Sequence, residues 1–209
     1  MKKSLLLTLM LAFGIVFQSQ AQNEDYRINV ALSGNYTFTG SVLSGIVETA
    51  QINGANIKEK SLPSLQVTAD YGISDWFSVG LAASYQKLGF EATGNTYTDA
   101  NGMQVTENYE YDFKRSSVAL RPLFHFANDE KLDMYSGLRV GFFNAKGTST
   151  SNDPDFNDDE DFDFDDVSKI TISIVAYGVR YYFTDNIGVG FELNIGRPYV
   201  TSFSVNARF

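Results

Sequence analysis

A strict alternation of apolar and polar residues recurs in eight segments and constrains the fold more than any other feature. In the first segment Ile28, Val30 and Leu32 alternate with Asn29 and Ser33. The other segments begin near residues 64, 77, 117, 132, 170, 187 and 202. Alternation with a period of two is typical of a β-strand with two unlike faces. Sustained helical periodicity is confined to the first 21 residues, so the pattern predicts an all-β fold.

The sixth segment changes phase partway along. Its apolar residues stand at even positions up to Ile174 and at odd positions from Val175 onward. One extra residue in a strand shifts the alternation in this way. We therefore expect a β-bulge near residues 174–176.

The polar faces indicate the environment of the strands. They consist of Ser, Thr, Asn, Gln, Gly and Ala with few charges, whereas a soluble β-sandwich or a lipocalin-like barrel would carry a charged outer face. Strands cross a bilayer only as a closed barrel, and each needs about 9–11 residues. The sequence thus predicts an eight-stranded antiparallel up-and-down transmembrane β-barrel. Ten strands stay open as a count if the first long connection pairs into the sheet.

The connections alternate between short and long, as in outer-membrane barrels. The long ones cover roughly residues 39–63, 91–115 and 144–168. Asn101-Gly102 is a signal for a two-residue type I′ turn and predicts a hairpin that projects beyond the membrane. Aromatic residues flank both kinds of connection, where barrels place their interfacial girdles.

The N-terminus predicts export. Lys2 and Lys3 precede an apolar stretch over residues 5–17, and Ser19-Gln20-Ala21 supplies small residues for cleavage. We expect a signal peptide over residues 1–21 and a barrel domain over 22–209, with both termini in the periplasm. The absence of Cys excludes a disulfide scaffold and Cys-ligated metals. The net charge of −9 argues against nucleic acid as a partner.

Two strand–turn–strand runs resemble a known family. Residues 177–190 (YGVRYYFTDNIGVG) and 71–80 (YGISDWFSVG) look like the signature of small outer-membrane β-barrel proteins, the porin-like group related to the OmpA membrane domain and OmpX. The C-terminal Phe209 resembles the terminal signal that the barrel-assembly machinery reads in that family. The resemblance implies a place in the outer membrane of a Gram-negative cell.

The polar faces carry seven ionisable residues that would point into the lumen: Asp70, Arg121, Asp133, Arg139, Arg180, Glu192 and Arg208. Interior charges are costly unless they are paired. We expect Glu192 to pair with Arg180 or Arg139, and Asp70 to pair with Arg121. The barrel would then hold a salt-bridged plug, and the alternative is a narrow ion path.

His125 is the only histidine and lies on a polar face. Ser117 and Asp70 could approach it from neighbouring walls as parts of a hydrolase site. The sequence contains no G-x-S-x-G or comparable nucleophile motif. We therefore predict a hydrogen-bonded filler and no enzyme.

Residues 153–166 hold nine Asp and Glu residues. Asp153, Asp155, Asn157 and Asp159 place oxygen ligands at alternating positions, as calcium loops do. Asp158 replaces the turn glycine of such loops, and Phe164 replaces their bidentate glutamate. The run is either a partial calcium site or a solvated loop that repels itself.

These observations predict a structural or surface-interaction role exerted through extracellular loops. The alternative is a narrow pore for ions or small solutes. The expected partners are outer-membrane lipid and lipopolysaccharide, the assembly machinery at Phe209, and divalent cations at the acidic loop. No pattern in the sequence calls for a cofactor.

Overall fold

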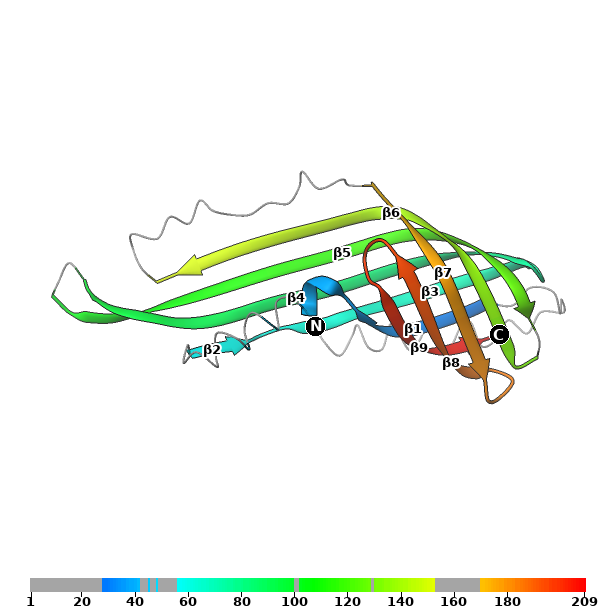
Figure 1. Cartoon of the computed structure of the whole chain (residues 1–209), viewed down its shortest axis with the longest axis horizontal. Coiled ribbons are helices and arrows are strands. Elements are labelled where there is room, and N and C mark those ends of the chain that lie inside the picture. The colour runs from blue at the N-terminus through cyan, green and yellow to red at the C-terminus, as the bar shows by residue number, and fades with distance from the viewer. Residues whose placement is uncertain are drawn as a thin grey trace, which may run out of the picture.

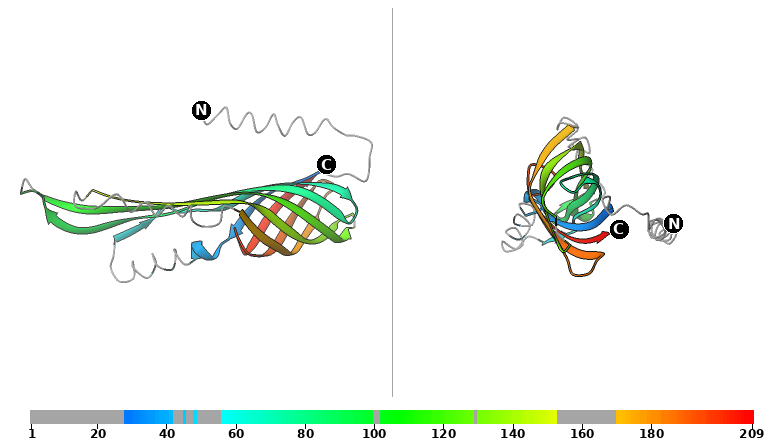
Figure 2. Two further views of the ribbon diagram at one scale, coloured as in Figure 1. Left: turned by 90° about the horizontal axis from the view of Figure 1, so that it is seen from above. Right: turned by 90° about the vertical axis from the view of Figure 1, so that its right-hand side faces the viewer.

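The computed structural model describes residues 28–41, 45, 48, 56–99, 102–128, 130–152 and 170–209. Their strands form one antiparallel sheet, eight strands of which close into a barrel (Figures 1 and 2). The barrel strands are β1 (Ile28–Tyr36), β3 (Leu62–Ser74), β4 (Phe77–Thr98), β5 (Gln104–Asn128), β6 (Leu132–Ser151), β7 (Ile170–Tyr182), β8 (Ile187–Ile195) and β9 (Thr201–Arg208). Consecutive strands pair, and β1 pairs with β9 to close the ring. The predicted eight-stranded up-and-down barrel is confirmed.

One described strand lies outside the ring. β2 (Asn56–Glu59) belongs to the first long connection and pairs with β4 from Thr93 to Phe90. Pairing of β3 with β4 begins further along, at Leu62 and Lys87. The connection therefore enters the sheet along the line of β3, and the number of strands around the barrel stays at eight.

The two faces of the barrel wall have the polarity that a lipid environment requires. Large apolar side chains point outward, and Leu32, Ile172 and Val205 are 59%, 69% and 60% exposed. Small polar and charged side chains point inward and are buried. A wall with an apolar exterior and a polar interior is characteristic of a transmembrane barrel. No helix among the described residues is long and apolar enough to cross a membrane.

Aromatic side chains mark both ends of the apolar band. Trp76, Phe126 and Phe183 are exposed near the short connections, at the end of the barrel that also holds Phe209. We call this the turn end. Tyr36 and Phe142 are exposed at the opposite end, as the sequence predicted. The distribution corresponds to two interfacial girdles.

Three strands continue far beyond the girdle opposite the turn end (Figure 2). Their outer parts and β2 form what we call the projecting sheet, residues 56–59, 87–98, 104–115 and 143–151. Pairing of β4 with β5 runs to Thr98 and Gln104. Pairing of β6 with β7 stops at Phe142 and Ile170. Among the described residues, the outer part of β6 is therefore paired with β5 alone.

The tip of the projecting hairpin differs from the predicted two-residue turn. The N–H of Asp99 donates to the carbonyl of Met103 at 2.8 Å, and the N–H of Gly102 donates to the carbonyl of Asp99 at 3.0 Å. Gly102 has a φ of +79°, the left-handed conformation that closes a three-residue loop. The hairpin is confirmed, but its loop is one residue longer than the type I′ prediction.

The predicted bulge in β7 is confirmed at Ala176. Tyr135 and Gly137 of β6 pair with Gly178 and Val175, so three steps along β7 match two along β6. The same shift occurs against β8. Val175 itself points inward and is fully buried, although the alternation assigned it to the apolar outer face. It packs with Leu123 and Tyr135 in a small apolar cluster inside the barrel.

Candidate functional site

All seven ionisable residues expected in the lumen are buried there. Their side chains come from β3, β5, β6, β7, β8 and β9, and none of the residues is more than 8% exposed. They are Asp70, Arg121, Asp133, Arg139, Arg180, Glu192 and Arg208. The period of two explains this placement, because each of them lies in phase with the polar face of its strand.

Four ion pairs join five of these residues into one chain. Arg121 contacts Asp70, with Nε to Oδ1 at 3.2 Å, and its Nη2 donates to Glu192. Arg180 contacts Asp70 through Nη2 and Asp133 through Nη1, the latter at 3.0 Å. Asp70 is thus shared by two guanidinium groups. A low-dielectric interior makes such pairing necessary, because an unpaired charge there is strongly destabilising.

The expected partners were partly right. The Asp70–Arg121 pair is present, because Asp70, Gly80 and Arg121 lie at one level on three adjacent strands. A Cβ at Gly80 would lie 1.9 Å from Oδ1 of Asp70, so this glycine leaves the room that the carboxylate needs. The expected pairing of Glu192 with Arg180 or Arg139 was wrong, since Glu192 forms its ion pair with Arg121.

Two tyrosines that the sequence reasoning missed hold Glu192 in place. The hydroxyl of Tyr135 donates to Oε1 at 2.7 Å, and that of Tyr199 donates to Oε2 at 2.8 Å. Tyr135, Gly178 and Glu192 lie at one level on adjacent strands, and Gly178 leaves space for the Tyr135 ring. Both tyrosines are 2% exposed. For Tyr135 the available signal was an aromatic residue in phase with the polar face of β6, whereas Tyr199 lies in the connection before β9, where no alternation applies.

Arg139 is connected to the network through neutral groups. Its Nη2 donates to Oε1 of Gln66 at 2.9 Å, and Nε2 of Gln66 donates to the hydroxyl of Tyr199 at 3.1 Å. Its guanidinium also lies over the Tyr199 ring, 4.6 Å from the centroid. These two contacts stabilise the buried guanidinium in place of a direct carboxylate partner, although its Nε has no hydrogen-bond partner among the described residues.

His125 contacts different residues from those expected. Its Nε2 lies 2.8 Å from Oγ of Ser78, and its Nδ1 lies 2.5 Å from Oδ1 of Asp133. Ser117 instead bonds to Ser84. The order Ser78–His125–Asp133 is that of a hydrolytic triad. Ser78 is only 4% exposed, so its hydroxyl lies in the barrel interior. The contacts are those of a hydrogen-bonded filler.

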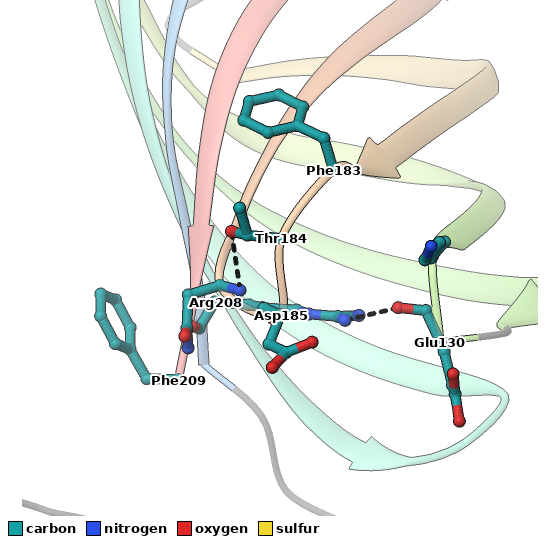
Figure 3. Close-up of a pocket in the computed structure, with 8 residues that line it drawn as sticks. Glu130, Phe183, Thr184, Asp185, Arg208 and Phe209 are labelled. Carbon is teal, nitrogen blue, oxygen red and sulfur yellow. Dashed lines mark hydrogen bonds between the residues drawn. The ribbon is translucent and has the colours of Figure 1, made fainter.

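Arg208 lies apart from the network, at the turn end (Figure 3). Its Nε donates to the carbonyl of Asp185 at 2.6 Å, and its Nη2 donates to the carbonyl of Glu130. The guanidinium also lies 3.9 Å from the centroid of the Tyr182 ring. These bonds surround a pocket of about 540 Å³ that is also lined by Phe209. Arg208 therefore ties the last strand to two turns.

The calcium candidates Asp153, Asp155, Asn157 and Asp159 lie outside the described residues. The part of the chain that is described contains no group of three or more His, Asp or Glu side chains placed to hold a metal ion. The acidic run therefore stays a prediction. So does the signal peptide, which also lies outside the described residues.

Solved structures that match this chain share little sequence identity with it. The N-terminal β-barrel domain of Pseudomonas aeruginosa OprF is 16% identical in sequence, with a TM-score of 0.43. The match covers 88% of this chain and 97% of the OprF domain. The attachment invasion locus protein Ail of Yersinia pestis is 15% identical, with coverages of 90% and 100% and a TM-score of 0.38. Neisserial surface protein A is 15% identical, with coverages of 88% and 94% and a TM-score of 0.36.

The family comparison covers nearly the whole chain. Residues 6–207 match the family described as outer membrane protein beta-barrel domain. A search of curated proteins finds no match. With its closed eight-stranded ring, apolar exterior and charged interior, the chain belongs to the outer-membrane β-barrel protein family.

Proposed function

We propose that this protein stabilises the outer membrane and contacts extended polypeptides at the cell surface through its projecting sheet. The observation that carries the proposal is the inequality of strand lengths. β4, β5 and β6 have 22, 25 and 20 residues, whereas β1, β8 and β9 have 9, 9 and 8. Spanning a bilayer takes about 9–11 residues. The excess of about ten residues per strand extends roughly 30 Å into the surrounding water.

The projecting sheet has a surface suited to water and to polar contacts. A groove of about 650 Å³ crosses it and is lined by Asn56, Lys58, Glu91, Ala92, Thr93, Asn108, Tyr109, Glu110, Thr150, Ser151 and Asn152. Beside the groove, Lys60 pairs with Glu91 and, at 3.2 Å, with Glu110. Charged and amide side chains of this density are incompatible with lipid, which supports an extracellular position.

The outer part of β6 supports an extended polypeptide as the partner. Among the described residues, 143–150 pair with β5 on one side, and β7, which begins at Ile170, does not pair with them on the other. A strand edge presents main-chain donors and acceptors that can pair with an added strand. The adjacent groove offers polar side chains that would select among such segments.

A shortened variant tests this role. Residues 92–109 are replaced by Asn-Gly, so that Glu91 and Glu110 flank a two-residue turn. Proteoliposomes with the full chain are expected to bind saturably to an immobilised library of extended peptides. The shortened variant keeps residues 143–150 of β6 but lacks Ala92, Thr93, Asn108 and Tyr109 of the groove, so it is expected to bind more weakly. A K58Q variant separates the contribution of the groove to peptide binding from that of the β6 edge, since Lys58 lines only the groove. Equal binding by the full and shortened chains would refute the proposal.

A folding control accompanies that comparison. Closed barrels resist detergent, so boiled and unboiled samples of both chains should migrate differently on a denaturing gel. A shortened variant without this difference would be unfolded. In that case K58Q carries the test of the groove, because it changes one lining side chain and leaves every strand at full length.

The lumen supports a structural role over conduction. Arg121 is 1% exposed and bridges carboxylates from opposite parts of the ring, which places a charged obstruction across the path. Planar-bilayer recordings are expected to show no steady conductance. A steady current that Glu192→Arg abolishes would instead establish the pore alternative.

The remaining predictions concern processing and partners. We propose cleavage after Ala21, which intact-mass measurement of the exported protein would detect as a chain that begins at Gln22. We also propose Phe209 as a contact for the assembly machinery.

Calcium binding at the acidic run is tested by calorimetric titration. The full chain is compared with a variant in which Asp155 and Asp159 are changed to Asn, and equal heats would refute a site.

A further inference from the structure

Where the barrel meets the projecting sheet, one arginine is buried with little compensation. Arg115 of β5 points inward and is 8% exposed. Its Nη1 donates to the hydroxyl of Thr39 at 3.3 Å. Its Nη2 is buried and finds no acceptor among the described residues. A buried donor without an acceptor is destabilising, and more so when the group is charged.

A second guanidinium lies close to the first. Arg197 belongs to the turn between β8 and β9 and lies over the Phe143 ring, with Cζ 5.3 Å from its centroid. Phe143 and Ala145 are inward-facing neighbours on β6, and Ala145 pairs with Arg115. Burial and the positive charge of Arg197 lower the pKa of Arg115 to about 10.

Carboxylates do not balance these two charges in the described part of the chain. Neither Arg115 nor Arg197 takes part in an ion pair there, whereas Arg121, deeper in the barrel, has two. The nearest acid along β5 is Asp112, and Lys87 and Lys114 contact it at 2.8 Å and 3.7 Å. Thr39 and Gln86, beside Arg115, are neutral.

We infer that Arg115 and Arg197 form a binding site for a soluble ligand that carries a phosphate or sulfate group. Such a group offers several oxygens to two guanidinium forks, supplies Nη2 of Arg115 with an acceptor and removes the repulsion between the two charges. The exposed Arg197 gives access from the aqueous side. Because Arg115 points into the barrel, a headgroup of the surrounding lipid cannot reach it. The site is independent of the peptide contact proposed above.

The test is titration of the full-length barrel in uncharged detergent micelles with inorganic phosphate or inorganic sulfate at constant ionic strength, with chloride as the reference. Binding is followed by the NMR signals of the arginine Nε–H groups. Saturable shifts of Arg115 and Arg197 are expected. R115Q and R197Q should each weaken binding at least tenfold. K114Q is the matched control, because Lys114 is adjacent, loses the same charge and points outward.

Three outcomes would overturn the inference. They are an absence of saturable shifts in the wild type, an affinity that falls equally in K114Q, and shifts that require phosphatidylglycerol in a nanodisc instead of free phosphate. If R115Q fails to fold, as judged by the boiled and unboiled gel comparison, the exposed R197Q carries the test alone. Peptide binding by the shortened hairpin is measured separately, so each proposal can fail without the other.

Discussion

The lumen and the projecting sheet use the same ion-pair chemistry with opposite consequences. In the lumen, Arg121 and Arg180 are 1% and 3% exposed, and each contacts two carboxylates. On the projecting sheet, Glu91 and Glu110 both contact the adjacent Lys60, but the Lys60 side chain is 33% exposed. Water and salt screen the exposed pairs, whereas a buried pair that loses one member leaves an uncompensated charge. Burial, more than the number of partners, decides which cluster holds the fold together.

The largest effect is expected from Arg121→Met. The change leaves Glu192 without its ion pair and Asp70 with Arg180 alone. The free energy of unfolding should fall by about 3–5 kcal/mol. Urea unfolding in detergent micelles, followed by the fluorescence of the single Trp76, measures it.

Two further variants decide whether burial is the reason. Lys114→Met removes a cation whose side chain is 50% exposed and should change stability by at most about 0.5 kcal/mol. Adding Glu192→Gln to Arg121→Met should recover part of the loss, because it neutralises the stranded carboxylate. Equal losses in Arg121→Met and Lys114→Met would contradict the comparison.

An intermediate effect is expected from Gly178→Ala. A Cβ at this position would lie 2.2 Å from the Tyr135 ring, so the ring must move and its hydrogen bond to Glu192 weakens. Overpacking of this kind costs about 1–3 kcal/mol. The same urea titration applies. Gly34→Ala is the control, since a Cβ there meets nothing within 4 Å. In a Tyr135→Ala background the penalty of Gly178→Ala should disappear, and persistence of the full penalty would exclude this contact as its cause.

The smallest effect on stability is expected at Lys60. Lys60→Gln should leave the urea midpoint unchanged, because the pairs of this residue are exposed.

The hydrogen bond with Glu91 raises the pKa of Lys60 above 10.5, with a further contribution from Glu110. The interaction is therefore complete below pH 10.5 and is lost as the pH rises through the higher folded value. The ¹³Cε shift of Lys60 should titrate above 10.5 and move back toward it in Glu91→Gln. A midpoint at or below 10.5 in the unmodified chain would contradict the assignment.

The sequence was sufficient to predict which side of the wall each strand residue points to, but not which residues of different strands lie at the same height in the barrel. Alternation identified the eight barrel strands, the inward charges and the bulge in β7, because a period of two determines the side to which each residue points. Which inward residues meet depends on the stagger of the strands around the barrel. That stagger brings Glu192 to Arg121 and His125 to Ser78, and no local pattern encodes it. The role of Gly80 likewise became visible only with its neighbours on both sides.

The bulge at Ala176 changes which face of the barrel wall the following residues of β7 point to. Before it, Ser173 and Val175 face the lumen, and after it Arg180 and Tyr182 do. Deleting this residue would exchange the two faces of the second half of β7 and turn the Arg180 guanidinium toward lipid, away from Asp70. The charge balance of the interior therefore depends on Ala176, and so does the aromatic belt at the turn end. The Ala176 side chain itself is part of neither.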